Sequence, residues 1–102
     1  MRIEIQQLVQ FGPLPPESEA APEKLREYEN LLSSIIKPIS DDEARALVKL
    51  LGPHKDSCFG IAWILVHLIE TAPGWPLKDC LDNTSNVWVS MLRDRANRGG
   101  VL

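Results

Sequence analysis

The sequence is poor in cysteine and has no long uninterrupted apolar run. Its two cysteines, Cys58 and Cys80, are too few for a disulfide framework, so we expect free thiols and a cytoplasmic location. The longest apolar run, residues 58–69, is shorter than the roughly 20 residues that a bilayer-spanning helix needs, and His67 interrupts it. The first residues carry no basic flank followed by an apolar segment, unlike a secretory signal. These absences predict a soluble protein without a membrane anchor.

Motifs that would indicate catalysis or metal binding are also absent. The chain has no glycine-rich phosphate loop and no serine-nucleophile elbow. His54, Cys58, His67 and Cys80 do not make a zinc site, because Cys58 and His67 are nine residues apart and face opposite sides of one predicted helix. His67 and Glu70 have an i, i+3 spacing, but helical metal sites combine two such pairs with further carboxylates. We therefore expect no metal, no cofactor and no catalytic residue.

Helical periodicity, by contrast, is abundant. A chain of 102 residues, 44% of them hydrophobic and 25% charged, fits a single globular domain. Apolar side chains recur at helical spacing in five segments, residues 1–11, 23–36, 41–51, 57–71 and 86–97. The first segment also fits a strand, but no later segment has the pattern of a partner strand. We predict an all-α fold, a small bundle of four to five helices with a proline-rich connector near the N-terminus.

Local signals mark the ends of these helices. Prolines make residues 12–22 an extended connector, and Pro22 fits the first turn of the next helix. We expect residues 1–22 to include any mobile part of the domain. Residues Ser40–Glu43 have the pattern of a capping box, in which the hydroxyl and the carboxylate each accept a backbone N–H. Polar side chains are expected to cap the two later helices: Asp56 or Ser57, and Thr84 or Ser85.

The helix predicted for residues 57–71 carries a semi-polar face, which we call the polar stripe: Gly60, Trp63, His67 and Glu70. One interpretation is a binding groove, in which Trp63 supplies contact area while His67 and Glu70 orient polar groups of a partner. The other is a core face, in which Gly60 admits a neighbouring helix and the two rings are buried with their N–H groups satisfied. The pattern favours the core interpretation, since small bundles often bury a hydrogen-bonded histidine.

Two further features fit both a structural and a binding role. Trp75 lies beside two prolines, where it would be a binding hot spot if exposed and a clamp on the core if buried. Arg93, Arg95 and Arg98 end the last predicted helix, where cations complement the helix dipole and Arg98 can pair with Asp94. Without neighbouring lysines or stacking aromatic residues, the three arginines do not predict a nucleic-acid site.

Charge is distributed unevenly along the chain. Residues 1–43 carry nine acidic and four basic side chains (net −5), and residues 44–102 carry five and seven (net +2), which gives the chain its net charge of −3. An acidic half repels phosphate backbones and suits a basic protein partner. Four acidic residues are the predicted interaction surface: Glu23, Glu27, Asp41 and Asp42.

By elimination, the sequence predicts a non-enzymatic protein-interaction module, an inhibitor, immunity-type or adaptor protein that acts on a basic partner. The alternative is a small-ligand binder or an enzyme that uses Trp63, His67 and Glu70 of the polar stripe. Composition leaves open a homodimer that hides apolar surface.

Overall fold

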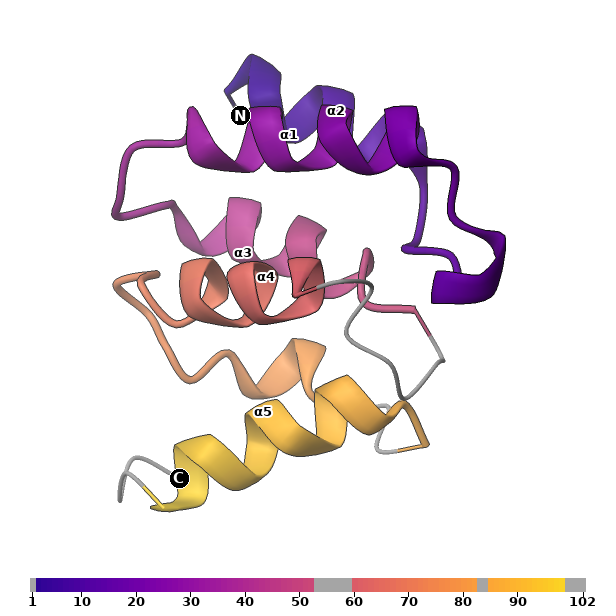
Figure 1. Ribbon diagram of the computed structural model, residues 1–102. Coiled ribbons are helices and arrows are strands. Elements are labelled where there is room, and N and C mark those ends of the chain that lie inside the picture. Colours follow the sequence, from indigo (N-terminus) through magenta and orange to yellow (C-terminus); the bar gives the residue numbers. More distant parts are fainter. Residues whose placement is uncertain (1, 53–59, 83–84, 99–102) are drawn as a thin grey trace.

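The protein is all-helical throughout the residues that its computed structural model describes, which are 2–52, 60–82 and 85–98 (Figure 1). These ranges hold five α-helices and no strand, which confirms the predicted fold class. The helices are α1 (Ile3–Phe11), α2 (Pro22–Ser33), α3 (Asp41–Val48), α4 (Ile61–Ile69) and α5 (Val87–Arg98). Two short 3₁₀ turns, η1 (Glu17–Glu19) and η2 (Lys78–Cys80), lie in the connections.

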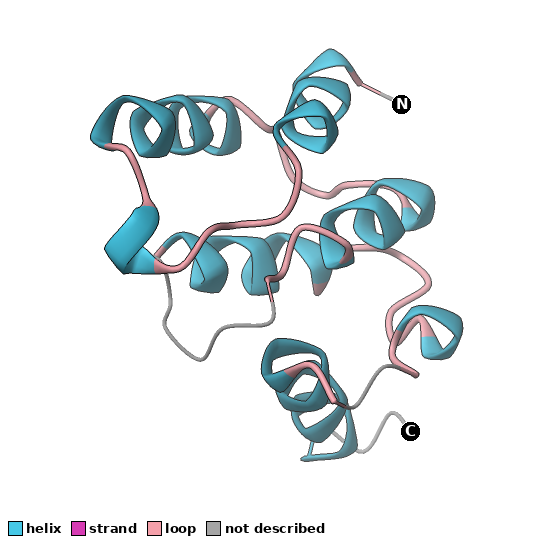
Figure 2. Ribbon diagram, turned by 90° about the vertical axis from the view of Figure 1, so that its right-hand side faces the viewer, coloured by secondary structure: helices cyan, strands magenta, loops and turns pink. Residues whose placement is uncertain are grey.

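The helices stack in three layers (Figures 1 and 2). Helices α1 and α2 form the first layer, α3 and α4 the middle one, and α5 with η2 the third. The middle layer is covered on both sides, so α4 buries most of its residues, as expected of a helix that is apolar on most sides. Its buried residues are Ile61, Ala62, Leu65, Val66, Leu68 and Ile69.

The first half of the fold follows its local signals closely. Residues 3–11 are a helix, and Pro22 begins α2. At the start of α3, Ser40 Oγ accepts the Glu43 N–H at 3.1 Å and Glu43 Oε1 accepts the Ser40 N–H at 2.8 Å, which confirms the capping box. Residues 2–22 pack onto the domain: Ile5 and Leu8 are fully buried, and the Leu14 N–H donates to the Leu50 carbonyl at 2.9 Å.

Helix α2 ends at Ser33, earlier than the predicted Ile36. The hydroxyls of Ser33 and Ser34 donate to the carbonyls of Asn30 and Leu31, and such bonds compete with continuation of the helix. Ile35 remains buried, but Ile36, the last residue of the apolar pattern expected for this helix, is 79% exposed and does not join the core.

The start of α4 differs from the prediction for Gly60. The expected caps Asp56 and Ser57 lie outside the described residues. Gly60 directly precedes the helix with a left-handed φ of 90°, and its carbonyl accepts the N–H groups of Trp63 and Ile64. Among the described residues, no atom lies within 4 Å of a Cβ built on Gly60, so none of the described helices packs closely on this glycine, contrary to the expectation. Glycine is suited to this position because of its backbone conformation.

Asn86 caps α5, a role that the sequence assigned to Thr84 or Ser85; Thr84 lies outside the described residues. Asn86 Oδ1 accepts the N–H groups of Trp88 at 2.9 Å and Val89 at 3.1 Å. Its Nδ2 donates to the Leu51 carbonyl at 3.0 Å. This one side chain therefore begins the last helix and ties it to the segment that follows α3.

Candidate functional site

The solvent-facing side of α4 exposes large side chains. Trp63 is 39% and Ile64 40% exposed, and His67 is also exposed. The Trp63 ring packs edge-to-face on Trp88, with ring centroids 5.1 Å apart and an interplanar angle of 88°. Trp88 itself is only 3% exposed, so a buried ring holds the exposed one in place. The favoured prediction that Trp63 and His67 are buried in the core was therefore wrong, because α5 covers only part of this side of α4.

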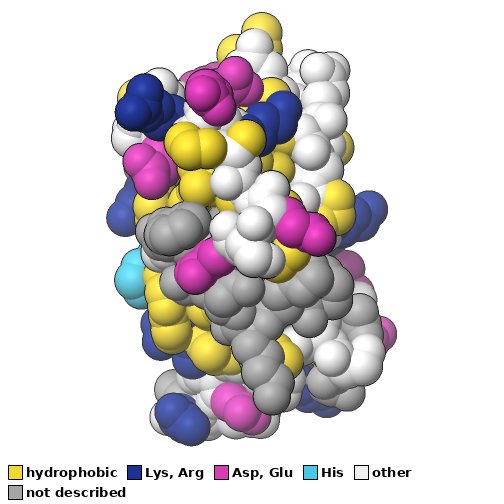
Figure 3. Space-filling model, turned by 45° about the vertical axis from the view of Figure 1, so that its right-hand side comes forward, with side chains coloured by type: hydrophobic (Ala, Val, Ile, Leu, Met, Phe, Trp, Pro, Cys, Tyr) yellow, Lys and Arg dark blue, Asp and Glu magenta, His cyan; other side chains and the backbone are white. Residues whose placement is uncertain are grey.

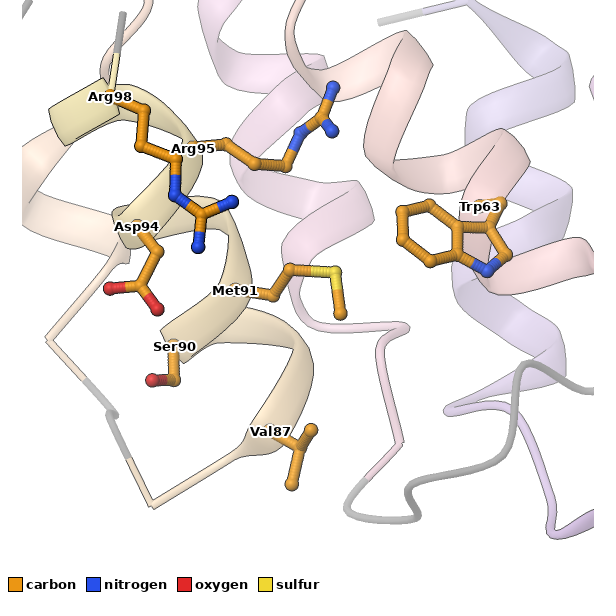
Figure 4. Close-up of a pocket in the computed structure, with 7 residues that line it drawn as sticks. All are labelled: Trp63, Val87, Ser90, Met91, Asp94, Arg95 and Arg98. Carbon is orange, nitrogen blue, oxygen red and sulfur yellow. The ribbon is translucent and has the colours of Figure 1, made fainter. Parts of the chain in front are cut away.

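A groove with a volume of about 520 Å³ runs between this side of α4 and α5 (Figure 4). Met91 and Arg95 reach from α5 toward Trp63, whereas Ser90 and Asp94 lie farther from it. The lining residues, which define the α4–α5 groove, are Trp63, Val87, Ser90, Met91, Asp94, Arg95 and Arg98.

An ion pair fixes one wall of the α4–α5 groove. Arg95 donates from Nε to Glu70 Oε2 at 2.8 Å and from Nη2 to Glu70 Oε1 at 2.7 Å. These hydrogen bonds raise the pKa of Arg95, so the guanidinium stays charged. Glu70, which the sequence offered as a ligand-orienting group, thus holds an arginine that lines the groove. The structure brings together two features that the sequence treated separately, the polar stripe and the C-terminal arginines.

The other predicted binding residues lie elsewhere. Trp75 is half-buried and packs against the core. The Gly74 N–H next to it donates to Asp41 Oδ1 at 2.7 Å, so Asp41 holds this turn. Asp42 forms an ion pair at 2.9 Å with Arg45. These contacts engage two of the four acidic residues predicted as an interaction surface.

The four acidic residues do not form one patch. Glu23 and Glu27 are exposed in the first turns of α2. The start of α2 and the start of α3, which carries Asp41 and Asp42, lie at opposite sides of the molecule (Figure 1). On the face shown in Figure 3, acidic side chains are interspersed with basic and hydrophobic ones. The predicted acidic surface is therefore divided into two separate pairs, and only the pair on α2 has no basic or backbone partner among the described residues.

The thiol that the structure describes is not activated. Burial raises the pKa of Cys80, and its Sγ donates to the Leu77 carbonyl at 3.1 Å. A thiol with a raised pKa is a weak nucleophile at neutral pH. Cys58 and His54 lie outside the described residues. Within the described ranges, no three His, Cys, Asp or Glu side chains are grouped so that they could hold a metal ion.

Comparisons with protein-family models, curated proteins and solved structures find no match to this chain. None of the helices in the described part of the chain combines the length and apolar character that crossing a membrane requires.

Proposed function

We propose that this chain is a protein-interaction module that binds its partner through the α4–α5 groove. The observation that carries the proposal is Trp63, a 39% exposed indole held edge-to-face against the buried Trp88. Binding energy at protein interfaces concentrates in a few large anchors, among which tryptophan and arginine are enriched. An indole that is already fixed loses little conformational entropy when a partner covers it.

The polar groups beside Trp63 support a contact surface over a catalytic site. The carboxylate of Glu70 is already bound by two nitrogens of Arg95, so it does not serve as a general base. His67 lies 6.5 Å from Trp63, measured between ring centroids, and is exposed rather than enclosed. These features weigh against the alternative of an enzyme or small-ligand binder that uses Trp63, His67 and Glu70.

A selection from a phage-displayed library of random peptides tests the proposal. Peptides enriched on the immobilised wild-type protein are expected to bind Trp63→Ala at least about tenfold more weakly, as for loss of a hot-spot side chain. Met91→Lys, on the facing helix, should weaken binding to a similar degree. The matched control is Ile36→Ala, which removes a 79% exposed apolar side chain outside the groove and should leave affinity unchanged. Retention of full affinity by both groove variants, with their circular dichroism unchanged, would contradict the proposal.

Our second proposal is that a basic partner binds to the acidic residues of α2. Glu23 and Glu27 are exposed one helical turn apart, and within the described ranges no hydrogen bond or ion pair engages them. The same selection tests this surface. Lys- and Arg-rich peptides that lose affinity for Glu23→Lys/Glu27→Lys, but not for Trp63→Ala, would place the binding site on α2. Peptides insensitive to that double charge reversal would rule this surface out.

A further inference from the structure

We infer that a hollow between α1 and α3 binds a small aliphatic carboxylate. This hollow, which we call the α1–α3 pocket, has a volume of about 580 Å³ and shares no lining residue with the α4–α5 groove. Its lining comes from the second half of α1, the turn that follows this helix, and the C-terminal end of α3 with the residues just after it. Sites for small organic molecules have volumes of about 300–1,000 Å³. The α1–α3 pocket is therefore large enough for such a ligand, and it is a second site beyond the function proposed above.

Hydrogen bonds hold the walls of the α1–α3 pocket in place. Helix α1 ends at Phe11, and Gly12 follows with a left-handed φ of 80°, a conformation that suits glycine. The Gly12 carbonyl accepts a hydrogen bond from Tyr28 Oη at 2.8 Å, which fixes the turn on α2. The Leu14 N–H donates to the Leu50 carbonyl at 2.9 Å, which fixes the same segment beside the end of α3. The pocket is thus formed before a ligand binds, and little ordering accompanies binding.

Aliphatic side chains form most of the lining. Leu50 is 2% exposed and lies at the base of the α1–α3 pocket, whereas Val9 is 46% exposed and lies at its rim. Pro13 and Ala46 are half-buried between them. No described residue of the lining is aromatic, so an aromatic ligand finds no ring on which to stack. The lining therefore favours an alkyl chain, which gains free energy by removing apolar surface from water.

The charge of the lining selects an anionic ligand. Lys49 is the one ionisable side chain among the described lining residues, and within the described ranges no hydrogen bond or ion pair engages it. Gln10, on the facing helix, supplies an amide that can donate to a carboxylate oxygen. The α4–α5 groove differs in this respect, since its lining carries Asp94 as well as two arginines. A carboxylate on an alkyl chain complements the α1–α3 pocket in both charge and apolar surface.

Titration of the isotope-labelled protein with sodium octanoate, followed through its amide chemical shifts, tests the inference. We expect the largest changes at the backbone N–H groups of Gln10, Gly12, Ala46 and Lys49, and none of that size at the indole N–H of Trp63. In the series butanoate, hexanoate and octanoate, each added CH₂ should raise the affinity by about twofold to fourfold, because it buries further apolar surface.

Lys49→Gln separates recognition of the carboxylate from general apolar binding. This variant should bind octanoate about threefold to fivefold more weakly, in the range of an exposed ion pair, and should bind octanol with unchanged affinity. The matched control is Lys37→Gln, which removes another exposed lysine, in the loop after α2, and should leave the affinity for octanoate unchanged. Val9→Asp, which places a negative charge at the rim, should weaken octanoate binding at least as much as Lys49→Gln. Circular dichroism checks that each variant is folded.

Every other result would count against the inference. Equal affinity of the wild type and Lys49→Gln for octanoate, or equal affinity of the wild type for octanoate and octanol, would overturn the carboxylate site. Shifts that centre on the α4–α5 groove and disappear in Trp63→Ala would mean that the ligand occupies that groove instead. No shift at millimolar octanoate would refute the α1–α3 pocket as a ligand site, while peptide binding through Trp63 would remain a separate question.

Discussion

Replacement of Glu43 by glutamine should destabilise the fold more than any other single carboxylate-to-amide change at the start of α3. Glu43 is 4% exposed. Its Oε2 accepts Arg2 Nε at 2.7 Å, and its Oε1 accepts Arg2 Nη2 at 3.2 Å and the Ser40 N–H at 2.8 Å. Arg2 Nη1 also donates to the Ile36 carbonyl at 2.8 Å. One carboxylate therefore joins the beginning of α1, the loop after α2 and the first turn of α3.

The size of the effect follows from the pKa of Glu43. Burial by itself raises that pKa, but hydrogen bonds from Arg2 and Ser40 outweigh it and lower the pKa from 4.5 to about 2. A shift of this size corresponds to at most about 3 kcal/mol. The side chain of Arg2 is 29% exposed and partly screened by water, so we expect about 2 kcal/mol for Glu43→Gln.

The same shift sets the pH dependence. Below pH 4.5 the unfolded chain takes up a proton at Glu43, whereas the folded chain does so only near pH 2. The contribution of Glu43 to stability is therefore complete above about pH 5 and disappears as the pH falls from 4.5 toward 2. The difference in unfolding free energy between the wild type and Glu43→Gln should shrink over this window.

Urea unfolding followed by circular dichroism, at pH 7 and at steps down to pH 2.5, measures both effects. The matched control is Asp42→Asn, the same chemical change at the preceding residue, whose side chain is 84% exposed in its ion pair with Arg45. We expect this control to cost no more than about 0.5 kcal/mol. The reasoning fails if the two variants are equally stable at pH 7, or if the wild-type advantage over Glu43→Gln persists unchanged at pH 2.5.

Two substitutions and one labelling experiment test individual contacts. Gly74→Ala should lower the unfolding free energy by about 1 kcal/mol in urea titrations, because the new Cβ would overlap the Asp41 carboxylate that accepts the Gly74 N–H. Asn86→Ala should cost about 1–2 kcal/mol in the same assay, through loss of the α5 cap, whereas Asn97→Ala on the exposed side of α5 should be nearly neutral. Cys80 should react with iodoacetamide at pH 7.5 more slowly in the folded protein than in urea, because burial raises its pKa; equal rates would contradict that assignment.

The sequence predicts most of the fold because its strongest signals are local. The capping box at Ser40 and Glu43, and Pro22 at the start of α2, each involve residues within a few positions of one another. The errors occur where a tertiary contact or a specific backbone angle decides the outcome. Asn86 caps α5 and also donates a hydrogen bond to the Leu51 carbonyl, 35 residues away in the sequence. At Gly60, the positive φ, and not close packing, accounts for the glycine.

The candidate site could be predicted only in pieces. The sequence shows that Trp63, His67 and Glu70 share one face of a helix. Because most of that helix is apolar, its sequence predicts that every face, including this one, is buried. Whether that face meets solvent depends on where α5 lies. Trp88 packs on Trp63, and Arg95 binds Glu70. In each pair the two residues are 25 positions apart in the sequence, so helical periodicity does not predict the contact.

The number of acidic residues in the sequence likewise overestimates the acidic surface, because the sequence does not show which carboxylates are paired or buried in the fold. The strongly acidic first part of the chain suggests a broad acidic face, but a carboxylate that is buried in an ion pair does not present its charge to a partner. Glu43 is buried against Arg2 in this way, whereas Asp42 stays exposed but has the positive charge of Arg45 beside it. Glu23 and Glu27 keep their charge exposed because they face outward from an amphipathic helix at the edge of the stack. A partner that recognises this protein by charge alone would therefore meet a small site on α2, whereas the α4–α5 groove offers an aromatic anchor and a charged rim together.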